Sequence, residues 1–242
     1  PIAGLPEVLA PGTQVAPLMD AVLAATGLPP GTLALAGTTD STAAVMATGA
    51  LAPGDAVTSL GSTLVLKMLG ARPINAPQFG VYSHRLGDLW LIGGASNSGG
   101  AVLRRFFADG QLRRLNEGMD PDRPSGLDYY PLPSPGERFP VNDPCLAPRL
   151  SPRPADDRAF LQGLFEGIAR IEALGYGLLC ELGAPPLTRV MTVGGGAANP
   201  VWTRIRQRLL GVPVAAAAHQ EAAYGAARLA LWGPPTDGAG PV

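Results

Sequence analysis

The stretch LTRVMTVGGGAANPVWTRIRQRLLGVPV, residues 187–214, changes its pattern twice. Its β-branched beginning predicts a strand, which runs into a Gly-rich turn at Gly194–Pro200. A helix over residues 199–211 and a short strand over residues 212–217 are expected to follow. The order of strand, helix and strand indicates an α/β domain built in layers.

The flanking segments extend this layered pattern. Apolar residues recur at helical spacing over residues 156–182, and a last helix is expected over residues 219–231. Residues 56–69 and 79–94 are rich in β-forming residues, and each run is split by a turn signal, so together they predict three or four antiparallel strands. Residues 120–155 contain ten prolines and predict a long loop that follows a defined path over the core.

The beginning of the chain has its own short elements. A helix is expected over residues 14–27, a buried strand over residues 31–37 and a helix of small residues over residues 41–51. The linker APGD marks a domain boundary near residue 53. The sequence starts with Pro1 and reads like the middle of a longer protein, so we expect an amino-terminal portion to be missing.

The composition limits the kinds of function that fit. The 242 residues are 46% hydrophobic and 15% charged, which favours a well-packed core over disorder. A net charge of −1 without a basic stripe gives nucleic-acid binding little support. Apolar runs are interrupted before the roughly 18 residues of a membrane span. The two cysteines and two histidines are isolated, which argues against a disulfide framework or zinc and favours a cytoplasmic protein.

Two turns have both a structural and a functional interpretation. The turn at Leu60–Thr63 is either an ordinary hairpin turn or a cradle where backbone and hydroxyl groups meet phosphate. The turn at Gly194–Pro200 either allows close packing of helix on strand or lets a flat ligand lie on bare backbone. It lacks the G-x-G-x-x-G pattern, which argues against a dinucleotide oxidoreductase. A helix is also expected from near Ser98.

Asp40 is the only charged residue between Asp20 and Asp55. Because it comes directly before a helix, it either caps that helix, worth about 1 kcal/mol, or acts as a general base. The helix dipole would keep its carboxylate ionised, and a kinase base has only to orient a hydroxyl and accept its proton late. The two roles are compatible.

The order of these pieces resembles the carboxy-terminal half of the FGGY family of carbohydrate kinases. The resemblance covers about residues 13–232 and is most specific over residues 194–214. The segment GERFPVNDP looks most like the xylulokinase and D-ribulokinase branch, with Glu137 and Arg138 interpreted as a salt-bridged loop anchor. The segments that carry the resemblance are AGTTDSTAAVMATGAL, SLGSTLVLK, IGGASNSGGAVLRRF, YYPLPSPGERFPVNDP, VGGGAANPVWTRIRQRLLGVPV and EAAYGAARLA.

This resemblance implies an α/β fold of the actin-like ATPase (ribonuclease-H-like) class, with a mixed sheet flanked by helices. Residues 1–53 would be the tail of a sugar-binding amino-terminal domain, residues 54–233 the nucleotide-binding domain and residues 234–242 a flexible tail. Asp40 matches the catalytic base, next to the sugar. The positions that match the ATP site are Gly61, Ser62, Gly94, Ser98, Gly195, Gly196 and Asn199.

The activity that the resemblance implies is phosphorylation of a sugar hydroxyl by ATP with Mg²⁺, for which no metal ligand is assigned. The branch favours a ketopentose, D-ribulose first and D-xylulose second. The family's Asp-x-Gly-Thr phosphate loop is not in this sequence, so the chain alone is expected to be inactive without its amino-terminal domain. The expected partners are the sugar, ATP and the amino-terminal domain. Neither nucleic acid nor a membrane is expected as a partner, and the oligomeric state, including a homodimer, is not decided by the sequence. The alternative is a non-enzymatic actin-like nucleotide-binding module, against which the retained Asp40 argues.

Overall fold

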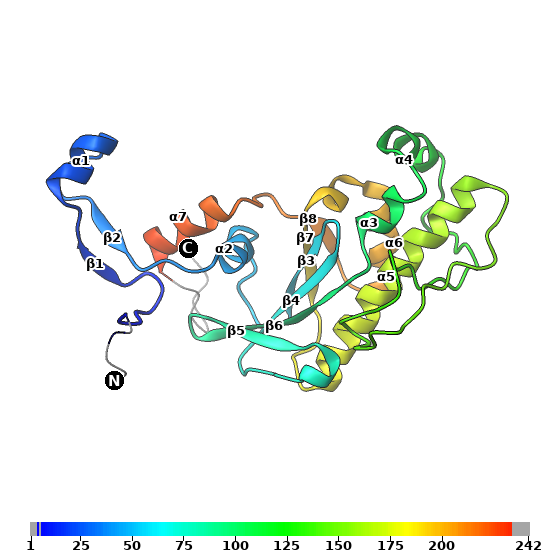
Figure 1. The fold of residues 1–242 in the computed structure, drawn as a ribbon, viewed down its shortest axis with the longest axis horizontal. Coiled ribbons are helices and arrows are strands. Elements are labelled where there is room, and N and C mark those ends of the chain that lie inside the picture. The colour runs from blue at the N-terminus through cyan, green and yellow to red at the C-terminus, as the bar shows by residue number, and fades with distance from the viewer. Residues whose placement is uncertain (1–3, 5, 234–242) are drawn as a thin grey trace.

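The computed structural model describes residue 4 and residues 6–233. A central sheet with helices on both faces forms the body, and a small lobe built from residues before Asp40 projects from one side (Figure 1). The flexible tail expected at residues 234–242 lies outside the described residues.

The central sheet has the strand order β5-β6-β4-β3-β7-β8. Strands β3, β4, β6 and β5 are antiparallel neighbours, whereas β7 runs parallel to β3 and β8 parallel to β7. The expected mixed sheet and its antiparallel strands are therefore confirmed. Strand β6 pairs with both β4 and β5, and this places β5 at the edge of the sheet. The strands are β3 (Asp55–Leu60), β4 (Leu64–Gly70), β5 (Tyr82–Leu86), β6 (Leu89–Ser96), β7 (Arg189–Val193) and β8 (Val214–Ala216).

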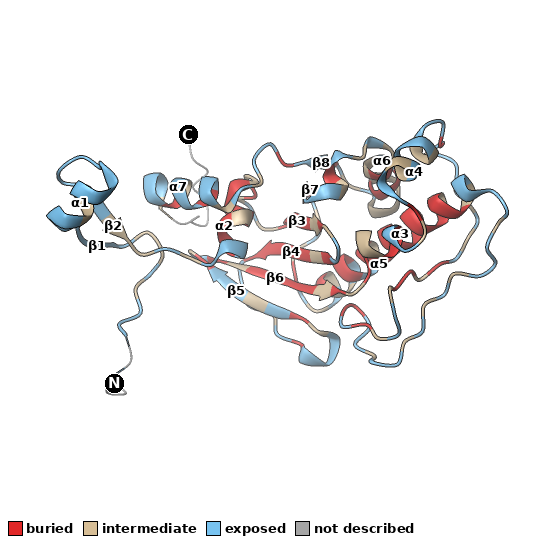
Figure 2. Ribbon diagram, turned by 45° about the horizontal axis from the view of Figure 1, so that its top comes forward, coloured by how far each residue is buried: buried red, intermediate tan, exposed pale blue. Residues whose placement is uncertain are grey.

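One face of the sheet packs against α5 (Asp157–Glu181) and α6 (Pro200–Leu210). Alternate residues of β4 enter this core, and the buried surfaces of α5 and the strands face each other (Figure 2). The long helix expected over residues 156–182 is confirmed, and Asp156 caps it by accepting a hydrogen bond from the Arg158 N–H at 3.0 Å. This face is the larger of the two described cores and supports the candidate site.

The other face is covered by α2 (Asp40–Ala47) and α7 (Ala222–Trp232), which also pack against each other. Both helices were expected from the sequence. Two short helices, α3 (Gly100–Arg104) and α4 (Asp109–Asn116), follow β6. Helix α4 has no buried residue and was not predicted, because its eight residues are mostly polar and only Leu112 and Leu115 face the core.

The projecting lobe consists of β1 (Gln14–Pro17), α1 (Asp20–Thr26) and β2 (Leu33–Leu35). The helix expected over residues 14–27 is wrong in its first part, because residues 14–17 form a strand that pairs antiparallel with β2. Pro17 explains the difference, since the residue before a proline avoids the helical conformation. Strand β1 and helix α1 have no buried residue.

The proline-rich segment of residues 120–155 follows a path fixed by buried polar contacts. The expected salt bridge between Glu137 and Arg138 is wrong. The Glu137 carboxylate is buried and accepts hydrogen bonds from the Ser96 hydroxyl at 2.6 Å and the Asn97 N–H at 2.6 Å. It also accepts the Arg138 backbone N–H, so Glu137 anchors the loop by hydrogen bonds instead of ion pairing.

Candidate functional site

The turns that follow β3 and β7 lie at the same edge of the sheet, because these strands are parallel neighbours in register. A pocket of about 450 Å³ opens between them. Its lining includes Gly61 and Ser62 from the first turn and Gly195, Gly196 and Asn199 from the second. The structure thus brings together five of the seven residues that were predicted to bind ATP.

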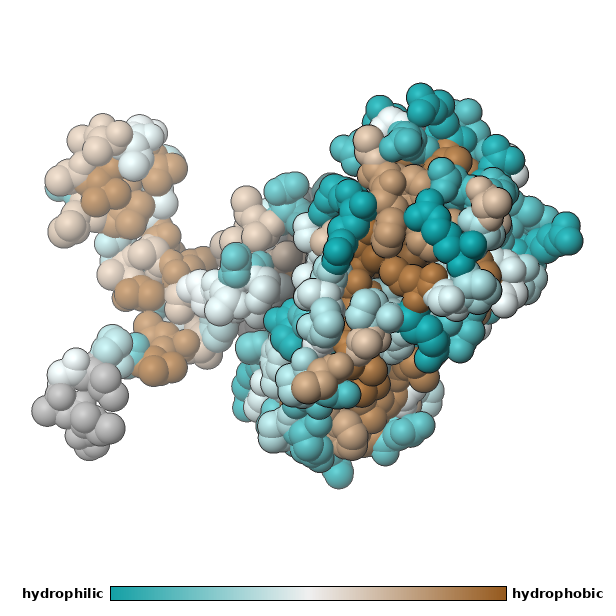
Figure 3. All heavy atoms as spheres, turned by 45° about the vertical axis from the view of Figure 1, so that its right-hand side comes forward, coloured by the Kyte–Doolittle hydropathy of each residue, from teal (hydrophilic) through white to brown (hydrophobic). Residues whose placement is uncertain are grey.

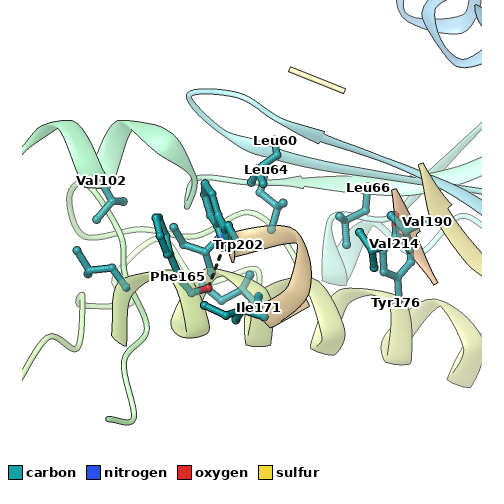
Figure 4. Close-up of a cluster of buried hydrophobic side chains, with 14 of the residues drawn as sticks. Leu60, Leu64, Leu66, Val102, Phe165, Ile171, Tyr176, Val190, Trp202 and Val214 are labelled. Carbon is teal, nitrogen blue, oxygen red and sulfur yellow. Dashed lines mark hydrogen bonds between the residues drawn. The ribbon is translucent and has the colours of Figure 1, made fainter. Parts of the chain in front are cut away.

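An apolar wall forms the far side of this pocket. Phe165 of α5 and Trp202 of α6 are stacked, with ring centroids 4.6 Å apart and planes at 18°. The Trp202 Nε1–H donates to the Phe165 carbonyl at 3.2 Å, which holds the indole against the helix (Figure 4). Leu103 and Leu112 from α3 and α4 complete the wall. Phe165 and Trp202 are buried behind this wall, and an apolar wall with polar groups at one end suits a ring-bearing ligand.

The glycines of the second turn have different roles. Gly194 has φ +85°, a conformation that side chains rarely adopt. A Cβ on Gly196 would lie 2.4 Å from the Leu60 side chain, so this residue lets the two turns approach each other. A Cβ on Gly195 would meet no atom within 4 Å. Asn199 caps α6 by accepting the Trp202 N–H at 3.0 Å.

The first turn is held by the start of α3. The carbonyls of Gly61 and Ser62 accept hydrogen bonds from the N–H groups of Gly100 and Ala101, at 2.8 and 3.0 Å. Within the described residues the N–H groups of Ser62 and Thr63 donate to no protein acceptor. The carbonyls of this turn thus point towards α3, and the N–H groups of Ser62 and Thr63 stay available. Free backbone N–H groups in a turn suit the binding of phosphate oxygens.

Arg104 adds a positive charge to this end of the pocket. Its Nη2 donates to the Ser62 hydroxyl at 2.8 Å, and both residues line the pocket. The guanidinium, the hydroxyl and the two amides can all donate to an anion, whereas the Asp109 carboxylate, which also lines the pocket, cannot.

Gly94 and Ser98 do not line this pocket. Ser98 is fully buried, and its hydroxyl donates to the carbonyl of Pro131. A Cβ on Gly94 would lie 2.5 Å from the Phe139 ring, so this glycine serves close packing. The residues of this region that reach the pocket are Gly100, Leu103 and Arg104. The helix begins at Gly100 and not near Ser98 as expected, because Gly99 has φ +143°.

Asp40 is the first residue of α2 and is not its cap. The N-cap is Thr39, whose Oγ1 accepts the Thr42 N–H at 3.4 Å and donates to the Thr42 hydroxyl at 2.9 Å. The Asp40 carboxylate is exposed, and its Oδ1 accepts the Ser41 N–H at 2.6 Å. Among the described residues it has no ion pair, and it does not line the pocket between the two turns.

In the part of the chain that the structure describes, no group of three or more histidine, cysteine, aspartate or glutamate side chains lies close enough to hold a metal ion. None of the described helices combines the length and apolar character needed to cross a bilayer.

A mixed sheet with paired helices on both faces and a Gly-turn pocket at one edge defines the actin-like ATPase class of fold. Within that class, the chain belongs to the FGGY family of carbohydrate kinases: residues 56–233 match the model of the family's C-terminal domain. The family and the fold expected from the sequence are thereby confirmed.

Individual relatives agree with this family. The structure is similar to that of a xylulose kinase from Brucella ovis, with 27% identity, a TM-score of 0.81, and coverage of 94% of this chain and 49% of that chain. It also resembles the ligand-bound xylulose kinase from Lactobacillus acidophilus, with 18% identity, a TM-score of 0.79, and coverage of 96% of this chain and 49% of that chain.

A gluconokinase from Bacillus subtilis (strain 168) is 24% identical over an alignment of 198 residues, which covers 74% of this chain and 38% of the gluconokinase. The chain therefore spans half or less of the length of these relatives.

Proposed function

We propose that the chain is the nucleotide-binding half of a carbohydrate kinase that transfers the terminal phosphoryl group of ATP to a sugar hydroxyl. The observation that carries this proposal is the meeting of two Gly turns at one pocket in a chain of the FGGY family. The stacked rings of Phe165 and Trp202 give the pocket an apolar side for the base, and the first turn gives it an end rich in donors for phosphate.

In this proposal the adenosine lies against Gly195, Gly196 and Asn199, and the phosphates extend towards Ser62 and Arg104. This orientation of the nucleotide follows from chemistry, because the phosphates need hydrogen-bond donors and the adenine base needs an apolar wall. Mg²⁺ would accompany the phosphates and neutralise part of their charge. We assign it no ligand from this chain.

Asp40 is proposed as the general base. Its carboxylate is exposed and free of ion pairs among the described residues, so it is available to accept a hydrogen bond from a sugar hydroxyl. As the proton leaves for Asp40, the sugar oxygen forms a bond to the terminal phosphorus of ATP, and the bond from that phosphorus to the bridging oxygen of ADP breaks.

Residues 1–53 are proposed to belong with a sugar-binding amino-terminal half, and residues 54–233 to form the nucleotide-binding domain. The projecting lobe supports this division for the residues before Asp40, because its apolar side chains face solvent (Figure 3), whereas α2 packs on the central sheet with α7. Val8 is 93% exposed and Met19 72% exposed. Such a surface is typical of a face that another domain covers. The chain without that half is expected to be inactive.

A ketopentose is the proposed substrate, with D-ribulose before D-xylulose. The likeness to xylulose kinases supports the ketopentose class, whereas the gluconokinase relative makes a sugar acid the competing class. A panel of ketopentoses and sugar acids, assayed for ATP-dependent phosphorylation by the complete enzyme, tests the choice. ATP binding without phosphorylation of any sugar would favour the non-enzymatic nucleotide-binding module instead.

The nucleotide site is tested most sharply at Gly195. A valine there would extend into the open pocket without meeting protein atoms, so Gly195→Val should raise the Kd for ATP at least about tenfold while leaving the Tm unchanged. The matched control is Gly177→Val on α5, which also has open space around it but lies outside the pocket. Calorimetric titration with ATP measures both. Equal affinities for the two variants would contradict the assignment.

A further inference from the structure

Helices α2 and α7 lie side by side with an unusually close backbone contact (Figures 1 and 2). A Cβ on Gly225 of α7 would lie 1.8 Å from the carbonyl oxygen of Ala43 and 2.6 Å from its carbonyl carbon, both in α2. Gly225 is buried within a regular helix and has no left-handed backbone angle. Glycine is therefore required here by the approach of another backbone and not by its own conformation.

This contact lies in the part of α2 that begins with Asp40. Ala43 is three residues after Asp40, so the carbonyl that Gly225 accommodates lies within one turn of the proposed base. The side chains around the contact are small or packed, since Ala43 and Ala47 are buried. Because a helical turn moves as a rigid unit, a displacement at Ala43 displaces Asp40 by a similar distance.

The residue just before the N-cap of α7 contacts the nucleotide turn. Gln220 lies one residue before the N-cap of α7, and its Oε1 accepts a hydrogen bond from the Gly194 N–H at 3.0 Å. Gly194 begins the turn that continues into the pocket-lining residues Gly195 and Gly196. The chain from Gln220 to Gly225 thus contacts the pocket turn at its beginning and the helix of Asp40 at its end.

We propose that the start of α7 fixes the distance between the nucleotide turn and Asp40, with Gly225 and Gln220 as positioning residues. This inference rests on the proposed function, in which Asp40 must meet a hydroxyl that attacks the bound nucleotide. Neither residue touches the substrate. A misplacement of about 1 Å can cost about 10²-fold in rate, because a general base must stay within hydrogen-bond reach of its proton.

The first test is Gly225→Ala in the complete enzyme, meaning this chain joined to the proposed sugar-binding half. The added Cβ forces α2 away, so kcat should fall about 10- to 100-fold while the KM for ATP stays within about twofold. Gly177→Ala on α5 is the matched control, since it makes the same change in a helix with open space around it. A folded Gly225→Ala enzyme with the kcat of the wild type would overturn the proposal.

A second variant keeps the proposal testable if Gly225→Ala does not fold. Gln220→Ala removes the hydrogen bond from the Gly194 N–H to the Gln220 side chain. A hydrogen bond contributes about 1 kcal/mol, so the KM for ATP should rise about fivefold. Gln220→Glu keeps the acceptor oxygen and should restore the wild-type constant. An unchanged KM in Gln220→Ala would count against a positioning role for this residue.

Amide hydrogen exchange separates this inference from the proposed function. If α7 joins the two sites, ATP binding should slow exchange in α2, and Gln220→Ala should reduce that slowing. ATP that binds without changing the exchange of α2 would refute the positioning role alone. A complete wild-type enzyme that binds no ATP would refute the proposed function and this inference with it.

Discussion

Thr39 and Asp40 are adjacent residues with different tasks at the start of α2. Thr39 satisfies the free N–H of Thr42 and so does the capping that the sequence left open for Asp40. Asp40 keeps one carboxylate oxygen on the Ser41 N–H and presents the remaining lone pairs to solvent. A threonine cap thus leaves the carboxylate free for chemistry.

This division of tasks predicts opposite results for two variants of the complete enzyme. Asp40→Asn keeps the shape of the side chain but cannot take a proton, so kcat should fall about 10²- to 10⁴-fold with the Tm and the ATP affinity unchanged. Thr39→Ala should cost about 1 kcal/mol of stability and leave most of the kcat. Steady-state kinetics and thermal melts check both. Wild-type turnover in Asp40→Asn would leave this residue without a catalytic role.

Single residues of the pocket could be predicted only in part. Gly61, Ser62, Gly195, Gly196 and Asn199 belong to turns that directly follow strong strand patterns, and parallel pairing of those strands brings the turns together. The prediction failed around the next strand. The resemblance assigned Gly94 and Ser98 to the ATP site, but both are packed in the core, and the pocket residues Gly100, Leu103 and Arg104 that follow them were missed.

At the scale of elements, a buried polar network joins two helices to two strands below the pocket. Arg206 of α6 and Glu172 of α5 are fully buried and form two hydrogen bonds of 2.6 Å. The Thr58 hydroxyl of β3 donates to Glu172 at 2.6 Å, and Arg206 donates to the Thr192 hydroxyl of β7 at 2.7 Å. Burial, and then the Glu172 carboxylate, raise the pKa of Tyr176, whose hydroxyl shares a hydrogen bond of 2.8 Å with Thr58.

Removing the arginine from this network leaves a carboxylate buried without its partner. Arg206→Met should therefore destabilise the protein by about 3–5 kcal/mol, as is typical when one partner of a buried pair is removed. Arg204→Met on the same helix is the matched control, because its ion pair with Asp122 is exposed and such pairs contribute about 0–1 kcal/mol. Urea unfolding of both variants gives the comparison. Similar losses would mean that the buried network contributes no more than a surface pair.

The order of the elements could be predicted better than their limits. Helices α5, α6 and α7 follow strong apolar periodicity, and the structure confirms them. Strand β1 was expected as a helix, because a short exposed strand has no periodicity of its own and is defined by its pairing with β2. The edge position of β5 also depends on pairing between strands and is not visible in any local pattern.

At the scale of the whole molecule, the sheet separates a large apolar core from a smaller one that contains a charge. Lys67 of β4 lies on the α2 side with Leu69, is only 8% exposed, and has no carboxylate partner among the described residues. Its Nζ lies 4.9 Å from the centre of the Tyr82 ring. Burial lowers the pKa of Lys67 from 10.5 to about 8. Burial, and then Lys67, lower the pKa of the neighbouring His84.

This buried amine predicts an alkaline rise in stability. The unfolded chain binds the Lys67 proton up to about pH 10.5, whereas the folded chain releases it near pH 8. Between these values the unfolded state holds more protons, so the free energy of unfolding should increase with pH. Lys67→Met has no proton to release and a similar length, so it should be more stable than the wild type at pH 7, and this advantage should shrink as the pH rises from 8 to 10.

Urea unfolding of the two proteins at several pH values measures this difference directly, and the difference isolates Lys67 because all other titrating groups are shared. The same variant should raise the pKa of His84, since the repulsion from the ammonium group is removed while the burial remains. A titration of the His84 ring protons by NMR follows that change. If the two unfolding profiles run parallel from pH 7 to 10, the Lys67 amine is as well solvated in the folded protein as in the unfolded chain.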